Sequence, residues 1–345
     1  MLVVEGERRA VKLGQNKIIS VTYTHLRAPT KRKATTAIII KVIISLVKFW
    51  KSILDGVEFS CKGDLKLRNI IINADDFGRH ELINLAVERA FRSGLLRSAT
   101  LMAGSIAFED AVKVAKRNLG LGVGIHFTLA NGNPVLPAEE IPTLVNADGQ
   151  FHGDYIKFLK RYLSGKISLE EVRAELAAQI NKIRRAGIKI THFDSHQHLH
   201  HVPGIIEIAL EVAKNIKAMR VANTRIFDGE LDSFGKFIGR LGLSSLAKYA
   251  AKEARKRGIA TPEHFAGIVA GESVSEDFML KLLEKLAEGT TEVMLHPGVD
   301  NNILKEYCAW EHDFEEELAA VTSKRVLKVI TEQKIAVISF KGLVK

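Results

Sequence analysis

From Arg68 onward, short apolar runs alternate with segments of helical periodicity, and this alternation constrains the fold more than any other feature of the chain. Apolar runs of this length predict buried strands, and the segments between them predict helices, two of which stop at Gly94 and Gly187. Strands that alternate with helices favour parallel pairing through crossover helices, and hence an α/β fold. The predicted strands are Asn69–Ala74, Ser98–Ala103, Gly122–Leu129, Ile188–Asp194, Ala218–Ala222, Phe265–Val269, Glu292–His296 and Ile335–Phe340. The predicted helices are Glu81–Ser93, Phe108–Asn118, Leu169–Ala186, Ile205–Lys214, Phe278–Ala287 and Phe314–Glu332.

These units suit one (β/α) barrel over residues 68–345, TIM-barrel-like but irregular or incompletely closed. An open doubly wound sheet is the competing architecture, and neither requires a second domain in this part of the chain. Two insertions interrupt the pattern. Asn131–Gly165 is rich in proline and follows the third strand at the edge where barrel enzymes hold their active sites, which predicts a substrate-covering loop. Residues 223–264 are helix-like and cationic, and a solvated helix face accounts for that charge.

The net charge of +10 belongs almost entirely to the N-terminal part of the chain. Residues 1–68 hold 14 Lys or Arg against 5 Asp or Glu, whereas the rest holds 36 against 35. The predicted barrel is therefore close to neutral, and its charge gives no reason to expect a nucleic-acid partner.

Residues 1–67 form a basic N-terminal extension in which residues 1–36 have no clear helix or strand period. Residues 37–54 are apolar but interrupted by lysines such as Lys41, Lys48 and Lys51, which fall on one side of a helix. A transmembrane span requires about 20 residues with few charges, so an amphipathic helix on an anionic membrane surface fits better. A helix packed on the barrel, or an extension from a misassigned start, would explain the same composition.

Cysteine usage indicates a reducing compartment. Cys61 and Cys308 form no CxxC motif and no disulfide framework, and no secretory signal peptide is recognisable. We therefore expect a cytoplasmic protein, with peripheral attachment to the inner membrane face if the residue 37–54 helix forms.

Two adjacent carboxylates, Asp75 and Asp76, end the first predicted strand of the barrel. Neighbouring side chains on an extended strand point in different directions, so one carboxylate can bind a cation while the other reaches a water molecule. This arrangement is typical of a metal-dependent hydrolase.

Histidines supply the other expected ligands. A period of two places His192, Asp194, His196, His198 and His200 on one side of the chain as long as it stays extended. So many imidazoles beside a carboxylate indicate a metal site or a proton relay rather than an ordinary core face.

His126 and His296 also lie near predicted strand ends, and Pro297 stops further sheet pairing after His296. One carboxylate and two imidazoles would hold a divalent cation and leave positions open for water and substrate. Such a mixed ligand set suits Zn²⁺ and tolerates Mg²⁺, Mn²⁺, Co²⁺ or Ni²⁺. The cation would acidify a bound water and polarise a carbonyl, a neighbouring carboxylate would take the proton, and a histidine would protonate the leaving amine.

Five motifs in order make the chain resemble the YdjC-like carbohydrate deacetylases. They are Asn-Ala-Asp75-Asp76-Phe-Gly, Ser98-Ala99-Thr100 with Met102, Gly122-Val-Gly-Ile-His126, Thr191-His-Phe-Asp194-Ser195-His196-Gln197-His198, and Glu292-Val-Met-Leu-His296-Pro-Gly. Within the family the chain is most similar to the hopanoid-biosynthesis-associated, HpnK-type members. That narrower resemblance rests on four motifs: Gly132-Asn-Pro134-Val-Leu-Pro137 with Glu140-Ile-Pro142, Asn146-Ala-Asp148-Gly149, Arg257-Gly-Ile-Ala-Thr-Pro262 and Trp310-Glu-His312-Asp313-Phe314-Glu315.

The resemblance implies a TIM-like barrel that removes N-acetyl groups from an acetylated amino sugar. It implies one divalent ion, Mg²⁺ or Zn²⁺, on Asp76, His126 and His196. Asp75 would be the base that activates metal-bound water, and His296 the acid or oxyanion partner. Asp194 and His198 are candidates for contacts behind the ligands or with the substrate.

The implied substrate is a chitooligosaccharide or, for the HpnK-type branch, an N-acetylglucosaminyl hopanoid or another lipid. Two alternatives remain: a metal-dependent hydrolase of another bond such as a phosphoester, and a membrane-surface protein that binds a glycan or lipid without turnover.

Overall fold

The computed structural model describes residues 8–13, 17–22, 68–223, 234–267 and 273–344. The chain divides into two units, Met1–Asp64 and Leu65–Lys345. In the first unit, β1 (Arg8–Leu13) pairs antiparallel with β2 (Lys17–Thr22), two strands that the sequence did not indicate, because residues 1–36 show no clear helix or strand period. Both strands contain β-branched residues, which favour extended backbone. The predicted helix at residues 37–54 lies outside the described residues.

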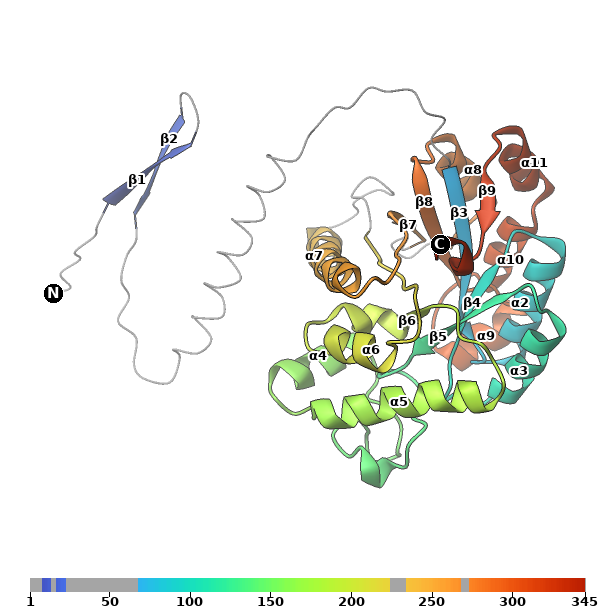
Figure 1. The fold of residues 1–345 in the computed structure, drawn as a ribbon, viewed down its shortest axis with the longest axis horizontal. Helices are drawn as coiled ribbons and strands as arrows, with labels where there is room; N and C mark the ends of the chain where they lie inside the picture. The colour runs from blue at the N-terminus through green and yellow to red at the C-terminus, as the bar shows by residue number, and fades with distance from the viewer. Residues whose placement is uncertain (1–7, 14–16, 23–67, 224–233, 268–272, 345) are drawn as a thin grey trace. The chain divides into compact units, whose positions relative to one another are not determined.

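A parallel sheet forms the centre of the second unit (Figure 1). Its strands follow the order β6–β5–β4–β3–β8–β7, and β9 pairs with the first half of β3. Every pairing in this sheet is parallel, as crossover helices require. The bounds are β3 Arg68–Phe77, β4 Ser98–Leu101, β5 Gly122–Phe127, β6 Phe193–Ser195, β7 His264–Ala266, β8 Gly289–Leu295 and β9 Ala336–Ile338.

Two isolated bridges join the open ends of this sheet into a ring. Phe193 of β6 bridges Met219, and Ala218 bridges Ala260, just before β7. The Met219 N–H donates to the carbonyl of Ala260 at 2.9 Å, and the Arg220 N–H donates to that of Phe193 at 3.1 Å. The predicted irregular (β/α) barrel is therefore confirmed, although the predicted strand Ala218–Ala222 contributes only bridging residues.

Helices surround the ring, and α5 and α6 pack side by side (Figure 1). The α-helices are α2 Glu81–Ser93, α3 Phe108–Arg117, α4 Tyr155–Leu163, α5 Leu169–Arg185, α6 Ile205–Val212, α7 Phe234–Lys256, α8 Glu276–Glu284, α9 Asn301–Cys308, α10 Phe314–Thr322 and α11 Lys324–Glu332. Short 3₁₀ helices are η1 Ala138–Glu140, η2 His196–His201 and η3 Phe340–Leu343. In the described part of the chain, no helix combines the length and apolar character that a membrane crossing requires.

One predicted helix is divided, and two helices were not predicted. The predicted helix Phe314–Glu332 breaks at Ser323, whose hydroxyl accepts hydrogen bonds from the first N–H groups of α11 and so starts a new helix. Helix α4 lies inside the proline-rich insertion, where Asp154 caps it. Helix α9 is short and begins after Asp300, which has a left-handed backbone conformation.

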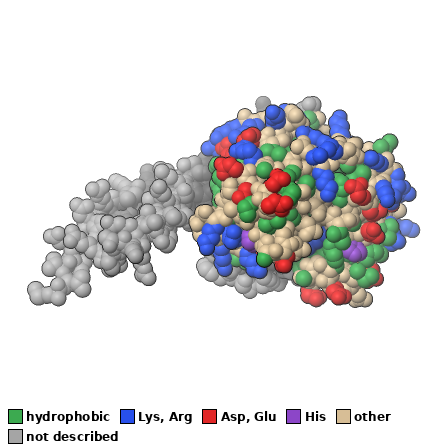
Figure 2. Space-filling model, turned by 90° about the horizontal axis from the view of Figure 1, so that it is seen from below, with side chains coloured by type: hydrophobic (Ala, Val, Ile, Leu, Met, Phe, Trp, Pro, Cys, Tyr) green, Lys and Arg blue, Asp and Glu red, His purple; other side chains and the backbone are tan. Residues whose placement is uncertain are grey.

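Both insertions pack against the barrel. In the first, Ile141 and Phe158 are buried, and Glu175 of α5 accepts hydrogen bonds from the backbone of Val135 and Leu136. In the second, α7 buries a stripe of alanines that includes Ala247 and Ala254, while the cationic side chains described on it, from Lys248 to Lys256, are exposed, as the sequence predicted. On the face drawn in Figure 2, basic and acidic side chains are interspersed.

The side chains of β3 change from apolar to polar toward its carboxyl end. Ile70 and Ile72 pack among the residues of the main core, whereas Ile71 packs with Ala218 and Phe340 in a separate small cluster. Because side chains alternate along a strand, residues 71, 73 and 75 share one face. That face is apolar at residue 71 and becomes polar toward the carboxyl end, which places the candidate site at the carboxyl edge of the ring.

Candidate active site

Strand β3 ends in a local irregularity that directs two adjacent carboxylates into the site. The register of β3 against β4 shifts between Ala74 and Phe77, and Asp76 has a φ of 58°. Aspartate tolerates this left-handed conformation better than most residues. On a regular strand the side chains of Asp75 and Asp76 would point to opposite faces, but here both reach buried polar residues, Thr100 beside Asp75 and His196 beside Asp76.

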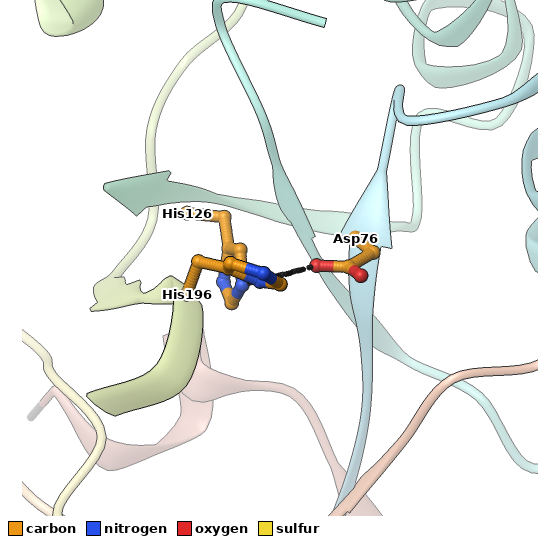
Figure 3. A group of neighbouring side chains, drawn as sticks. All are labelled: Asp76, His126 and His196. Carbon is orange, nitrogen blue, oxygen red and sulfur yellow. Dashed lines mark hydrogen bonds and ion pairs between the residues drawn. The ribbon is translucent and has the colours of Figure 1, made fainter. Parts of the chain in front are cut away.

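Asp76, His126 and His196 converge from three different elements, as Figure 3 shows. Asp76 Oδ1 lies 3.0 Å from Nδ1 of His196 and 3.3 Å from Nε2 of His126. Its other oxygen, Oδ2, accepts a hydrogen bond from Arg79 at 2.7 Å. All three members of the group are buried. The structure thus brings together the three residues that the family resemblance implied as metal ligands.

The distances and donor types fit a single cation. Donor atoms about 2.1 Å from a common ion lie about 3.0–3.4 Å apart at tetrahedral or octahedral angles, as these do. Nε2 of His126 and Nε2 of His196 are buried and lack a hydrogen-bond partner among the described residues. Nδ1 of His126 lies 2.7 Å from Asp194, which orients the ring so that Nε2 faces Asp76, where a cation would take the place of a proton.

The carboxylates around His126 and His196 also stabilise a positive charge between these side chains. Burial opposes protonation of His126, but Asp194 and Asp75 raise its pKa to about 10. Burial alone would raise the pKa of Asp76, yet His196 and Arg79 hold it well below its usual value. A cation at this position would be stabilised by the same carboxylates.

Arg220 organises a second group of charges beside the first. It is fully buried and binds Asp75 with two hydrogen bonds of 2.6 Å each. It also lies 2.7 Å from Asp194 and donates to Glu292 at 2.7 Å. Burial raises the pKa of Glu292 to about 8, so this side chain is mostly protonated at neutral pH. The bidentate pair keeps Asp75 ionised and fixed in orientation.

The two groups together hold one more carboxylate than arginine. Asp75, Asp76 and Asp194 face Arg79 and Arg220, which leaves an excess of one formal negative charge that His126 balances when it is protonated. Because Asp194 contacts both His126 and Arg220, it joins the two groups into one network. A bound divalent cation would offset the excess.

Two other groups of ligand-type residues lie within the described part of the chain. One is Asp75 with His126 and Asp194, but Arg220 already neutralises its carboxylates. The other is His296 with His312 and Glu317. Glu317 is occupied, because its oxygens accept hydrogen bonds from the backbone N–H groups of Val274 and His296. The group around Asp76 is therefore the strongest candidate for a metal centre.

His296 follows β8 and forms a wall of the site with aromatic neighbours. Its ring lies edge-on to Trp310, with centroids 5.0 Å apart, and near His312 at 5.6 Å. Burial lowers its pKa, while Asp76 and Asp75 act in the opposite direction. His296 therefore follows the carboxyl end of β8 and has an aromatic neighbourhood.

The predicted row of histidines does not continue past Ser195. The chain is extended through β6, but Gln197 and His198 have positive φ values of 54° and 57°, and residues 196–201 form η2. The one-sided arrangement predicted for His192 to His200 is therefore wrong. The turn directs His196 toward Asp76, whereas His198 packs edge-on against Phe265 and stacks on His201.

The rest of the row has structural contacts. His192 stacks on Phe340 at 3.9 Å and lies 3.0 Å from the side-chain oxygen of Asn73. His200 bonds to Ser195 and to the backbone carbonyl of Arg220. These contacts make both residues supports of the site rather than members of it.

Sequence reasoning missed Arg220 and Arg79. Arg220 is the single charge in the apolar run Ala218–Ala222, and a lone charge in a predicted buried strand is a signal of a buried partner. Its carboxylate partners lie far away in sequence, so the sequence alone could not name them. Arg79, three residues after Asp76, has no comparable signal.

The fold and the site define a class: an α/β barrel with a buried carboxylate–histidine group at the carboxyl edge of its strands, where barrel enzymes hold their active sites. The chain belongs to the YdjC-like protein family, whose model matches residues 69–332.

Two curated relatives are both named carbohydrate deacetylase. The one from Brevibacillus brevis is 30% identical over 276 residues, covering 79% of this chain and 99% of the relative. The one from Listeria monocytogenes serotype 4b is 33% identical with the same coverage. A solved structure from Enterococcus faecalis V583, described as a candidate cellobiose-phosphate cleavage protein, matches with a TM-score of 0.64 and 26% identity. It covers 81% of this chain and 100% of its own.

Proposed function

We propose that this protein removes the acetyl group from an acetylated amino sugar with the help of one divalent cation. The enzyme class, carbohydrate deacetylase, follows from family membership and from relatives matched over almost their whole length. The observation that carries the metal dependence is the convergence of Asp76, His126 and His196 beside an ionised Asp75. Mg²⁺ and Zn²⁺ are the ions this ligand set favours most.

A bound cation supplies Lewis-acid chemistry, which acidifies water and polarises the amide carbonyl. Asp75 takes the proton of the attacking water. Its Oδ1 already accepts hydrogen bonds from Arg220 and Asn73, so Oδ2, bound by Arg220 alone among the described contacts, is the oxygen with room for a proton.

His296 donates a proton to the departing nitrogen as the carbon–nitrogen bond breaks. A lowered pKa makes this imidazole a ready donor once it is protonated. The products are acetate and a free amino sugar. Asp194 orients the His126 ring through its contact with Nδ1. His198 packs edge-on against Phe265, and among the described contacts it has no bond to Asp76, His126 or His196.

For the substrate, we propose an N-acetylglucosaminyl group, either in a chitooligosaccharide or as the headgroup of a hopanoid or other lipid. The HpnK-type motifs favour the lipid-linked form, and they include residues 310–315, next to the proposed acid. A lipid substrate also gives a reason for the basic extension to contact an anionic membrane.

The decisive assay incubates metal-reconstituted protein with N-acetylglucosaminyl lipids, chitooligosaccharides and sugar phosphates, and follows products by mass spectrometry. We expect loss of one acetyl group and stoichiometric acetate. Release of phosphate without acetate would support a phosphoesterase, and binding without product would support a scaffold; either outcome contradicts the proposal. Asp76→Asn, which keeps the size of the side chain, is the matched inactive control.

The role of the N-terminal extension is tested by a chain that starts at Arg68. Because the chemistry lies beyond that residue, this chain should fold and deacetylate a soluble substrate. It should lose binding to anionic liposomes, to which lysines such as Lys41 and Lys48 contribute about 1 kcal/mol each, and the full chain's binding should weaken with salt. Equal sedimentation of both chains with liposomes would contradict a membrane role.

A further inference from the structure

Helix α9 and the loop after it present exposed apolar side chains beside the candidate active site. Ile303, Tyr307 and Trp310 are 48%, 43% and 41% exposed. They lie four and three residues apart in sequence, a spacing that brings Ile303 and Tyr307 to one face of α9 and Trp310 to its end. Large aromatic side chains usually bury most of their surface, so two of them left exposed within four residues indicate a surface that binds something.

Both aromatic residues are linked directly to groups of the site. The indole of Trp310 stands edge-on to His296, at a centroid distance of 5.0 Å and an interplanar angle of 88°. The hydroxyl of Tyr307 donates to the backbone carbonyl of Arg79 at 3.1 Å, and the Arg79 side chain binds Asp76. The exposed aromatic surface therefore continues from the proposed acid and from the metal group.

The indole of Trp310 is held in one orientation. One of its faces stacks on His312, at 4.0 Å and 14°, and Phe314 contacts it edge-on at 5.7 Å. Its backbone N–H donates to the carbonyl of Lys305 at 3.2 Å. His312 is itself buried beside Glu317, at 3.2 Å. His296 lies only 5.6 Å from His312 and so stands beside the stacked pair rather than over the other face of the indole, which leaves that face open.

We infer that the open face of Trp310 is a platform on which a pyranose ring of the acetylated sugar stacks. A pyranose presents a face of C–H groups to such a surface, and the electron-rich face of an indole attracts their partial positive charge. The hydroxyl groups at the rim of the sugar stay free to bind water or polar side chains. The inference rests on the proposed function, because it assigns the sugar to the same site.

The position of the platform matches the chemistry next to it. The nitrogen that leaves in deacetylation is bonded to the sugar ring and must come within reach of His296 to be protonated. A ring stacked on Trp310, whose indole contacts His296, lies directly beside that imidazole. A rigid, stacked aromatic would position the ring and contribute to binding without taking part in proton transfer.

The first test uses the small number of tryptophans. The chain contains two, Trp50 and Trp310, so Trp50→Phe leaves Trp310 as the sole source of tryptophan emission. In a Trp50→Phe/Asp75→Asn protein loaded with metal, di-N-acetylchitobiose should change the Trp310 emission in a saturable way. Anionic vesicles without sugar should not. A response to vesicles alone, or none to a sugar that the enzyme deacetylates, would overturn the inference.

The second test separates binding from proton transfer. Trp310→Ala should raise KM for di-N-acetylchitobiose by about tenfold and change kcat by less than about twofold. Trp310→Phe keeps an aromatic ring and should raise KM by a smaller factor. Leu119→Ala is the matched control, since Leu119 is 86% exposed and precedes β5, at the opposite end of that strand from His126. An unchanged KM with a lowered kcat would mean that the indole only orients His296, and would overturn the inference.

The failure of this inference can be told from the failure of the proposed function. If wild-type protein releases acetate but Trp310 variants keep the wild-type KM, the platform is wrong and the deacetylase stands. If no acetate is released from any sugar, the proposed function fails, and a saturable Trp310 response to the sugar would still support the platform.

Discussion

Asp75 and Asp76 are adjacent in sequence, but their charges are balanced in different ways. Asp75 is neutralised within the protein by a bidentate pair with Arg220. Asp76 shares one oxygen between two imidazoles, His126 and His196, and has only Arg79 on the other. Both side chains are almost fully buried, so burial does not distinguish them.

The difference assigns different tasks to the two carboxylates. A carboxylate that a buried arginine holds by two hydrogen bonds keeps its position and charge whether or not a ligand is present. A carboxylate that lies beside two buried imidazoles is suited to hold a cation together with them. Asp75 should therefore affect turnover without affecting metal content, and Asp76 should affect both.

The largest expected effect follows from removing a metal ligand. His126→Ala and His196→Ala should each lose tight metal binding and reduce kcat/KM by at least about 10³-fold, because the Lewis acid is lost. Metal content by mass spectrometry and acetate release measure the two losses. His264→Ala, at the start of β7, is the control histidine. Stoichiometric metal in both ligand variants would show that the ligand assignment is wrong.

Replacing Asp75, the proposed proton acceptor, should lower turnover without lowering metal content. Asp75→Asn keeps the shape of the side chain, and we expect kcat to fall by about 10²–10⁴-fold while metal content stays at the wild-type level. Single-turnover acetate release, measured beside metal analysis, checks both statements. A near-wild-type rate would remove Asp75 from the mechanism, and loss of metal would remove the contrast with Asp76.

Removing the internal counter-ion should destabilise the fold. Arg220→Met leaves Asp75 and Asp194 buried without their main cation, and we expect the free energy of unfolding to fall by about 3–5 kcal/mol. Arg220→Lys keeps the charge but cannot form the bidentate pair, so the free energy of unfolding should fall by less. Denaturant unfolding of the two variants is the measurement. Equal, small losses would mean that the arginine contributes little to stability.

Acid should destabilise the protein through its buried histidines. Burial holds the pKa values of His192, His198 and His200 well below the usual value and lowers that of His201 to about 3. Below pH 6.5 the unfolded chain binds protons at these positions and the folded chain does not, so stability falls as pH falls. Glu292, with a pKa of about 8, acts in the opposite direction down to about pH 4.5, as does Glu175, whose pKa burial also raises, but these are two groups against four.

The urea midpoint, measured between pH 7 and pH 4.5, tests this prediction. We expect a net loss of more than about 1 kcal/mol per pH unit once the pH is below 6.5. Stability that stays constant or increases from pH 6.5 to pH 4.5 would contradict the assignment of these four histidines as neutral in the folded protein.

The sequence predicted the barrel and the gathering of carboxylates and histidines at one edge, because apolar runs define the strands and parallel strands bring their carboxyl ends to one edge; the choice of Asp76, His126 and His196 came from the family resemblance. It could not predict the left-handed pair Gln197 and His198, which turns the chain into η2 and separates His196 from the later histidines. No period in the sequence records such a local reversal.

The role of Arg220 depends on distance in the chain. Its partners Asp75 and Glu292 are 145 and 72 residues away, and only the closed ring brings the three together. The platform at Trp310 was equally hidden, because an unpredicted helix, α9, sets its position. Local patterns therefore revealed the strand ends, whereas long-range pairs required the structure.

The central claim is that one divalent cation binds at Asp76, His126 and His196, and locating the ion tests it most directly. Anomalous diffraction from crystals of the protein soaked in Mn²⁺ or Zn²⁺ should show one peak about 2.0–2.3 Å from a carboxylate oxygen of Asp76 and from one ring nitrogen each of His126 and His196. A peak at His296, His312 and Glu317 instead, or no peak within reach of Asp76, would contradict the account.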